Sequence, residues 1–141
     1  MEDTTLITLY RKLAQMYNKL DFSGIADYFA EDIVYESQNV FVPLTGKNNL
    51  LYYLDGKFKT IRKSNKPVFA EIGIMRRQSG ARVKLASVKP GDHCIILSQG
   101  TVENKVALVF IKASGGLITR IDICTVVPHW SFAIGTGEYP S

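Results

Sequence analysis

The sequence predicts a single α+β domain over residues 1–141, in which helices pack on one face of a mainly antiparallel sheet. Three observations predict it. Apolar residues recur at helical spacing as far as residue 62, they alternate with polar residues after Lys66-Pro67, and turn residues separate the alternating runs at short intervals. Short connections between successive strands indicate antiparallel neighbours. A chain of 141 residues, 46% hydrophobic and 21% charged, suits one globular core.

The first part of the chain is expected to form about three helices. Residues 5–20 predict an amphipathic helix, because apolar side chains recur at three- and four-residue steps at Leu6, Tyr10, Leu13, Tyr17 and Leu20. Ser23 is placed to cap a second, short helix over 24–30 that carries Ile25, Tyr28 and Phe29 inward. A third helix is expected over 47–62, with a buried stripe of Leu51, Leu54, Phe58 and Ile61.

Strands are expected at 33–37, extending through 40–42, and at five later runs, 68–77, 82–88, 93–102, 106–113 and 117–127. The fourth of these later runs is apolar on both faces: Val106, Leu108 and Phe110 point one way, and Ala107, Val109 and Ile111 the other. The predicted helices cover only one face of the sheet. We therefore predict a homodimer through the open sheet face, which a monomeric mass at micromolar concentration would contradict.

The stretch that begins at Tyr17 reads YNKLDFSGIADYFAEDIVYES, and LTGKNNLLYYLDGKF follows it and ends at Phe58. Nearer the C-terminus the chain reads SGGLITRIDIC. In order and spacing these stretches resemble the nuclear transport factor 2-like superfamily, and the last is similar to the final strand of its SnoaL-like and steroid isomerase-like members. The resemblance implies a cystatin-like α+β cone, with about three N-terminal helices on a strongly bent, mainly antiparallel mixed sheet and a pocket between sheet and helix.

The reaction does not follow from that resemblance, because isomerases, cyclases, dehydratases, epoxide hydrolases and non-catalytic binders share the fold. Two positions argue against steroid isomerase activity. The resemblance places the base of those enzymes at Ser37 and their first-helix tyrosine at Leu13. A serine without an adjacent base cannot abstract a proton beside a carbonyl.

Asp122 is the candidate acid/base residue, since SnoaL-like cyclases are similar in placing an aspartate in the last strand. It alternates with Ile118, Arg120 and Cys124, so these four side chains are expected on one face. On the concave face, Arg120 and Asp122 would pair inside the pocket as in epoxide hydrolases of this fold, with Glu71 as the second carboxylate. The alternative is an ordinary ion pair on the solvent or dimer face, and Glu71 likewise faces either the pocket or water.

Tyr17 and Tyr35 are candidates to donate hydrogen bonds to a ligand carbonyl, with core packing as the alternative for both. Phe58 and Trp130 complete the predicted ligand-binding set, Trp130 either at the pocket mouth or as a hydrophobic plug. The sequence contains no zinc-ligand spacing, phosphate loop or dinucleotide fingerprint, so no metal and no cofactor are expected.

Basic residues gather in 57–89, which holds ten Lys or Arg against one acid. No nucleic-acid-binding motif accompanies them, so a solvated basic face is favoured over a nucleic-acid site. No apolar run approaches the roughly 20 residues that span a bilayer, and the acidic start MED lacks a basic signal region. We therefore expect a cytoplasmic protein that does not enter membranes.

Two functions fit these features. The first is a pocket protein for an apolar, carbonyl-bearing small molecule, either a binder or a cofactor-independent cyclase, isomerase or lyase. The prediction requires a cavity of roughly 300 Å³ or more. The alternative is a non-catalytic homodimerisation or protein-interaction module of the same fold.

Overall fold

The computed structural model describes residues 3–38, 42–76, 90–125 and 133–141. These residues form two α-helices, α1 (Asp3–Lys19) and α2 (Lys47–Ser64), and one seven-stranded sheet. The strands are β1 (Phe29–Ser37), β2 (Leu44–Thr45), β3 (Val68–Met75), β4 (His93–Gln99), β5 (Lys105–Ser114), β6 (Leu117–Cys124) and β7 (Ala133–Gly135). The predicted strand at 82–88, residues 40 and 41 and Trp130 lie outside the described residues.

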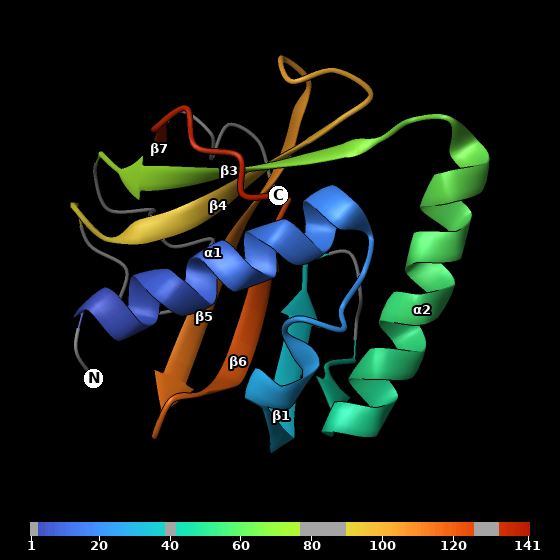
Figure 1. The fold of residues 1–141 in the computed structure, drawn as a ribbon, viewed down its shortest axis with the longest axis vertical. Coiled ribbons are helices and arrows are strands. Elements are labelled where there is room, and N and C mark those ends of the chain that lie inside the picture. Colours follow the sequence, from blue (N-terminus) through green and yellow to red (C-terminus); the bar gives the residue numbers. More distant parts are fainter. Residues whose placement is uncertain (1–2, 39–41, 77–89, 126–132) are drawn as a thin grey trace.

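The sheet has the strand order β2-β1-β6-β5-β4-β3-β7 and is mixed. Only the β1–β6 pair is parallel among the strands described, and every other neighbouring pair is antiparallel. The sheet is strongly curved, with α1 lying across it and α2 standing beside β1 at its edge (Figure 1). The predicted α+β cone on a mainly antiparallel mixed sheet is therefore confirmed.

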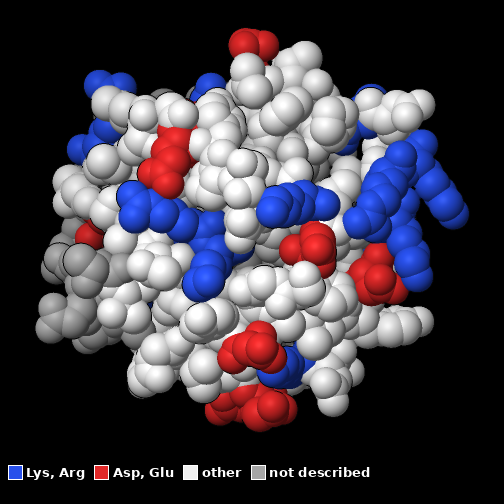
Figure 2. Space-filling model, in the orientation of Figure 1, with Lys and Arg blue, Asp and Glu red and all other residues white. Residues whose placement is uncertain are grey.

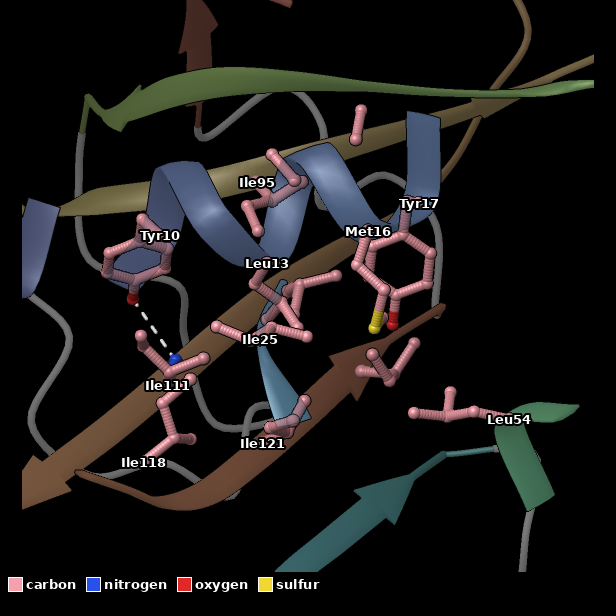
Figure 3. Close-up of a cluster of buried hydrophobic side chains, with 14 of the residues drawn as sticks. Tyr10, Leu13, Met16, Tyr17, Ile25, Leu54, Ile95, Ile111, Ile118 and Ile121 are labelled. Carbon is pink, nitrogen blue, oxygen red and sulfur yellow. Dashed lines mark hydrogen bonds between the residues drawn. The ribbon is translucent and has the colours of Figure 1, made fainter. Parts of the chain in front are cut away.

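Helix α1 forms where the apolar spacing predicts it and buries that stripe against the sheet. Leu9, Tyr10, Leu13, Met16 and Tyr17 are all buried, and several meet isoleucines of β4, β5 and β6 in the core (Figure 3). The backbone N–H of Ile111 donates to the Tyr10 hydroxyl at 3.1 Å. This hydrogen bond fixes the position of α1 along β5 and satisfies a polar group that burial would otherwise penalise.

The predicted second helix is wrong. Residues 24–30 contain only a short 3₁₀ turn, Ala26–Tyr28, and β1 already begins at Phe29. Phe29 is buried and pairs with Ile118 of β6, so strand pairing outweighs the weak helical tendency of this stretch. Tyr28, expected to point inward, is 37% exposed, and the Lys12 ammonium lies 4.9 Å from its ring centroid.

Helix α2 extends two residues beyond the predicted end and stops where Asn65 adopts a left-handed conformation, with φ of 58°. Its buried residues are Leu50, Leu54, Phe58 and Ile61. The buried stripe therefore contains Leu50, and the predicted Leu51 only packs against the core from a half-buried position.

Both faces of the sheet bury apolar side chains within a single chain. Ala107, Val109 and Ile111 belong to the core under the helices, and Leu108 and Phe110 to a second cluster on the opposite face. The second cluster also contains Met75, Cys94, Ile96 and Cys124. The predicted alternation in β5 is thus confirmed from Ala107 to Ile111, whereas Val106 is 37% exposed and belongs to neither cluster. Burial of Leu108 and Phe110 does not itself require a second copy, and the homodimer stays a prediction.

The C-terminal segment returns to the start of the chain. Strand β7, which the sequence did not predict, pairs with the edge strand β3. Beyond it, the Asn18 amide donates to the carbonyls of Pro140 at 2.7 Å and Ala70 at 2.9 Å, and Arg11 pairs with Glu138 at 2.8 Å. No helix in the described ranges has the length and apolarity that crossing a membrane requires.

Candidate functional site

A pocket of about 1180 Å³ lies between α2 and the helix-facing side of the sheet. One wall comes from α2, the other from β1 and β3 to β6, and Tyr17 contributes from α1. Apolar side chains form much of its surface, namely Ile61, Val68, Leu97, Ala107 and Ile123. A volume of this size accommodates a drug-sized molecule.

One face of α2 is directed at the pocket. Tyr53, Gly56, Lys57 and Thr60 all line it, at the i, i+3, i+4 and i+7 positions that share a helix face. Glycine in a helix interior costs about 1 kcal/mol relative to alanine. No packing contact explains Gly56, because a Cβ atom added there meets nothing within 4 Å. Its missing side chain leaves space on the pocket wall.

Three tyrosines from three elements meet in this pocket: Tyr17 of α1, Tyr35 of β1 and Tyr53 of α2. The Tyr35 and Tyr53 rings lie 5.3 Å apart between centroids, and Tyr17 packs edge-on against Phe58 at 6.4 Å. Burial raises the pKa of both Tyr17 and Tyr35, and nearby tyrosines raise them further. Both phenols therefore stay neutral at physiological pH and can donate hydrogen bonds.

The pocket offers little for proton abstraction. Of the lining residues that the structure describes, Asp55 is the one carboxylate, and it pairs with Lys59 at 2.9 Å on the exposed side of α2. Ser37, where the sequence resemblance placed the isomerase base, does line the pocket. Leu13, at the position of the isomerase tyrosine, is fully buried in the core.

Arg120 and Asp122 lie on the opposite face of the sheet from the pocket. Their strand presents Ile121 and Ile123 to the core under the helices, and Asp122 sits between those two residues. Ile118 belongs to that same core, so it does not share a face with Asp122 as the alternation predicted. The β5–β6 register shifts between Lys112 and Ala113, opposite this part of β6, and the irregularity breaks the simple alternation.

The partner of this pair is Glu36. It stands directly opposite Asp122 in the parallel β1–β6 pairing, and Arg120 forms hydrogen-bonded ion pairs with both carboxylates. The Arg120 guanidinium reaches Asp122 through Nε at 2.8 Å and Nη2 at 3.1 Å. Burial raises the pKa of Asp122, and the bonds from Arg120 oppose that rise. The arrangement matches the predicted alternative of an ion pair outside the pocket.

Glu71 also lies away from the pocket, beneath the C-terminal segment. Its carboxylate accepts a hydrogen bond from the backbone N–H of Gly137 at 2.8 Å. A Cβ atom on Gly135 would lie only 2.2 Å from Glu71 Oε2, so glycine is needed for this close approach. Glu71 therefore holds the tail in place and does not contact Arg120 in any ion pair that the structure describes.

Of the predicted site residues, the structure brings Tyr17 and Tyr35 together in the pocket. Phe58 lies behind the wall, buried against Tyr17 and Phe22. Tyr53, Gly56, Lys57 and Lys105 are among the pocket residues that the sequence reasoning missed. The helical spacing of Tyr53, Gly56 and Lys57 was a usable signal, because it places them on one face of α2 beside its buried apolar stripe. The described residues contain no group of three side chains suited to hold a metal ion.

No protein-family model and no curated protein sequence matches the chain. Solved structures do resemble it. A nuclear transport factor 2-like protein of unknown function from Mesorhizobium loti superposes with a TM-score of 0.61 at 12% identity, over 88% of this chain and 93% of that one. An LEH-like epoxide hydrolase from M. tuberculosis gives 0.56 at 14% identity, over 88% and 84%.

A steroid delta-isomerase from Pseudomonas aeruginosa gives a TM-score of 0.52 at 16% identity, over 85% of this chain and 78% of that one. At these identities the similarity establishes the fold and leaves the reaction open. The cone fold that the sequence resemblance predicted is confirmed, with two described α-helices in place of about three.

Proposed function

We propose that this chain, which has the nuclear transport factor 2-like fold, uses its pocket to bind an apolar small molecule that carries a carbonyl or similar hydrogen-bond acceptor. The observation that carries the proposal is the combination of a large, mostly apolar pocket with the neutral hydroxyls of Tyr17 and Tyr35 in its lining. A buried phenol O–H cannot hydrogen-bond to water, and a ligand oxygen that accepts from it supplies the missing hydrogen bond.

Binding is favoured over a cyclase, isomerase or lyase reaction. Each of those reactions needs a group that takes a proton from the substrate. In the described lining the one carboxylate, Asp55, is exposed and paired with Lys59. Asp122 has no part in this proposal, because it lies on the other face of β6. The neighbours named as a steroid delta-isomerase and an epoxide hydrolase support small-molecule binding, since both names denote enzymes that act on small molecules.

The test compares two ligands that differ only at the acceptor, 2-acetylnaphthalene and 2-ethylnaphthalene. Their affinities are measured by displacement of the neutral fluorescent probe N-phenyl-1-naphthylamine. The wild type is expected to prefer the ketone, and Tyr35→Phe to weaken ketone binding about three- to tenfold, the effect of one lost hydrogen bond. The hydrocarbon should bind both proteins equally.

Tyr28→Phe is the matched control, because Tyr28 is a half-exposed tyrosine outside the pocket lining. It should leave both affinities unchanged. Failure of both ligands to bind the wild type, or an equal loss of both in Tyr35→Phe, would contradict the proposal.

A further inference from the structure

The mouth of the pocket is basic. Its described lining contains Lys57 and Lys59 from α2 and Lys105 from β5, against Asp55 as the only carboxylate. The whole of α2 has the same bias, with five basic residues and one acid. Blue side chains gather over the α2 edge of the molecule in Figure 2. A ligand that enters here meets a positive potential.

Two of these three lysines are not neutralised by a carboxylate that the structure describes. Lys59 is neutralised by Asp55 at 2.9 Å. Lys57 and Lys105 form no ion pair with any carboxylate that the structure describes. Both are half-buried, and the Lys57 ammonium lies 5.8 Å from the centroid of the Tyr53 ring. A half-buried ammonium is less screened by water than a fully exposed one.

The two lysines come from opposite walls. Lys57 stands on the pocket-facing side of α2, one residue from Gly56, and Lys105 stands at the start of β5. Leu97, Ala107 and Ile123, all buried, line the same pocket. An anion at this mouth would lie in the positive potential of both side chains while its apolar body lay against these lining residues.

We propose that the natural ligand is an amphipathic carboxylate, with its apolar body in the pocket and its carboxylate held between Lys57 and Lys105. This rests on the proposed function and specifies its ligand class. A carboxylate is favoured over a phosphate, since the described α2 lining begins at Tyr52 and excludes the first helical turn, whose backbone N–H groups are the part of a helix that holds phosphates.

The experiment uses three naphthyl ligands with the same probe displacement: 2-naphthylacetic acid, its methyl ester and 2-naphthyl phosphate. The acid is expected to bind the wild type about three- to tenfold more tightly than the ester, from two solvent-screened ion pairs. The Lys57→Gln/Lys105→Gln double variant should lose this preference and keep its affinity for the ester. Adding 0.5 M NaCl should reduce the preference in the wild type, because about 0.5 M salt screens such pairs.

Lys63→Gln is the matched control, since Lys63 is an exposed lysine of the same helix outside the lining. It should retain the preference for the acid. The single variants Lys57→Gln and Lys105→Gln should each lose part of it, which keeps the test valid if the double variant does not fold.

The outcomes separate the two proposals. If the ester binds and the acid binds no better, or if the double variant keeps the preference, the carboxylate proposal is overturned and the apolar pocket stands. Tighter binding of the phosphate than of the acid also overturns it. If neither ester nor acid binds, the proposed function fails as well.

Discussion

Arg120 holds two partly buried carboxylates side by side. Asp122 follows it by two residues along β6, and Glu36 stands opposite Asp122 on the parallel neighbour β1. The exposed fractions of the carboxylate side chains are 14% for Glu36 and 10% for Asp122, so water screens their mutual repulsion poorly. Arg120 therefore stabilises the sheet mainly by compensating this repulsion.

Replacing Arg120 with alanine should leave two buried like charges. We expect Arg120→Ala to lower the free energy of unfolding by about 2–3 kcal/mol at pH 7. Without the guanidinium, the Asp122 pKa rises further above its unfolded value. The folded state then binds more protons than the unfolded state between those two pKa values, so stability is lost as pH rises and regained as it falls.

Urea unfolding at pH 7 and pH 4 measures this effect. The loss in Arg120→Ala should be clearly smaller at pH 4. The control, Arg11→Ala, removes the exposed pair with Glu138 and should cost no more than about 1 kcal/mol at either pH. An equal loss for Arg120→Ala at the two pH values would mean that carboxylate repulsion is not the cause.

The residues of the pocket were only partly predictable from sequence. Tyr17 and Tyr35 were identified because each lies on a predicted helix or strand and carries a hydroxyl that can donate a hydrogen bond. Glu36 was missed as the partner of Arg120, because 84 residues separate them and only the parallel pairing of β1 with β6 brings them together. Asp122 was proposed from the resemblance, and the sequence left open which face of the sheet it occupies; the predicted alternation of Asp122 with Ile118 fails because β6 is irregular there.

The position of β7 and the C-terminal tail depends on a contact between Glu71 and Gly135 that leaves no room for a side chain at residue 135. The Glu71 carboxylate occupies the space beside Gly135 and accepts from Gly137 on the same segment. The sequence pattern identified β1 and β3 to β6 from their alternation, whereas the two-residue strand β2 and strand β7 were missed. Strand β7 has only three residues, and a run so short has no detectable period.

Gly135→Ala should displace the Glu71 carboxylate and break its hydrogen bond to Gly137. The expected cost is about 1 kcal/mol of unfolding free energy. The matched control is Gly56→Ala, where the added Cβ meets open space and should stabilise α2 by up to about 1 kcal/mol. Urea midpoints measure both.

A double-mutant cycle with Glu71→Ala checks the cause of that loss. Once Glu71 has been shortened, Gly135→Ala should cost much less, because the displaced group is gone. A cost that is unchanged in the Glu71→Ala background would show that the strain at Gly135 has another origin.

For the molecule as a whole, the order of the longer helices and strands was predictable because apolar residues repeat along each of them with the helical or the strand period. The predicted second helix failed because pairing of Phe29 with Ile118 decided the local structure. The pocket itself was not predictable in detail. Its walls meet only where the curved sheet brings β1 and β3 to β6 opposite α2, and that curvature cannot be read from any single segment of the sequence.

The central claim is that the space beside Gly56 is an open pocket for an apolar molecule. Gly56→Phe fills that space from the helix wall, and it should not destabilise α2, because phenylalanine has a higher helix propensity than glycine. The control, Gly56→Ala, adds a single methyl group and should bind like the wild type.

The most direct measurement is a fluorescence titration of N-phenyl-1-naphthylamine into the wild type, Gly56→Ala and Gly56→Phe, with thermal unfolding of each protein measured in parallel. We expect saturable binding to the first two and at least about tenfold weaker binding to Gly56→Phe, since the added ring takes up the apolar surface that the probe would bury. The unfolding temperature of Gly56→Phe should be no lower than that of the wild type. Absence of saturable binding to the wild type, or equal affinity in a folded Gly56→Phe, would contradict the claim.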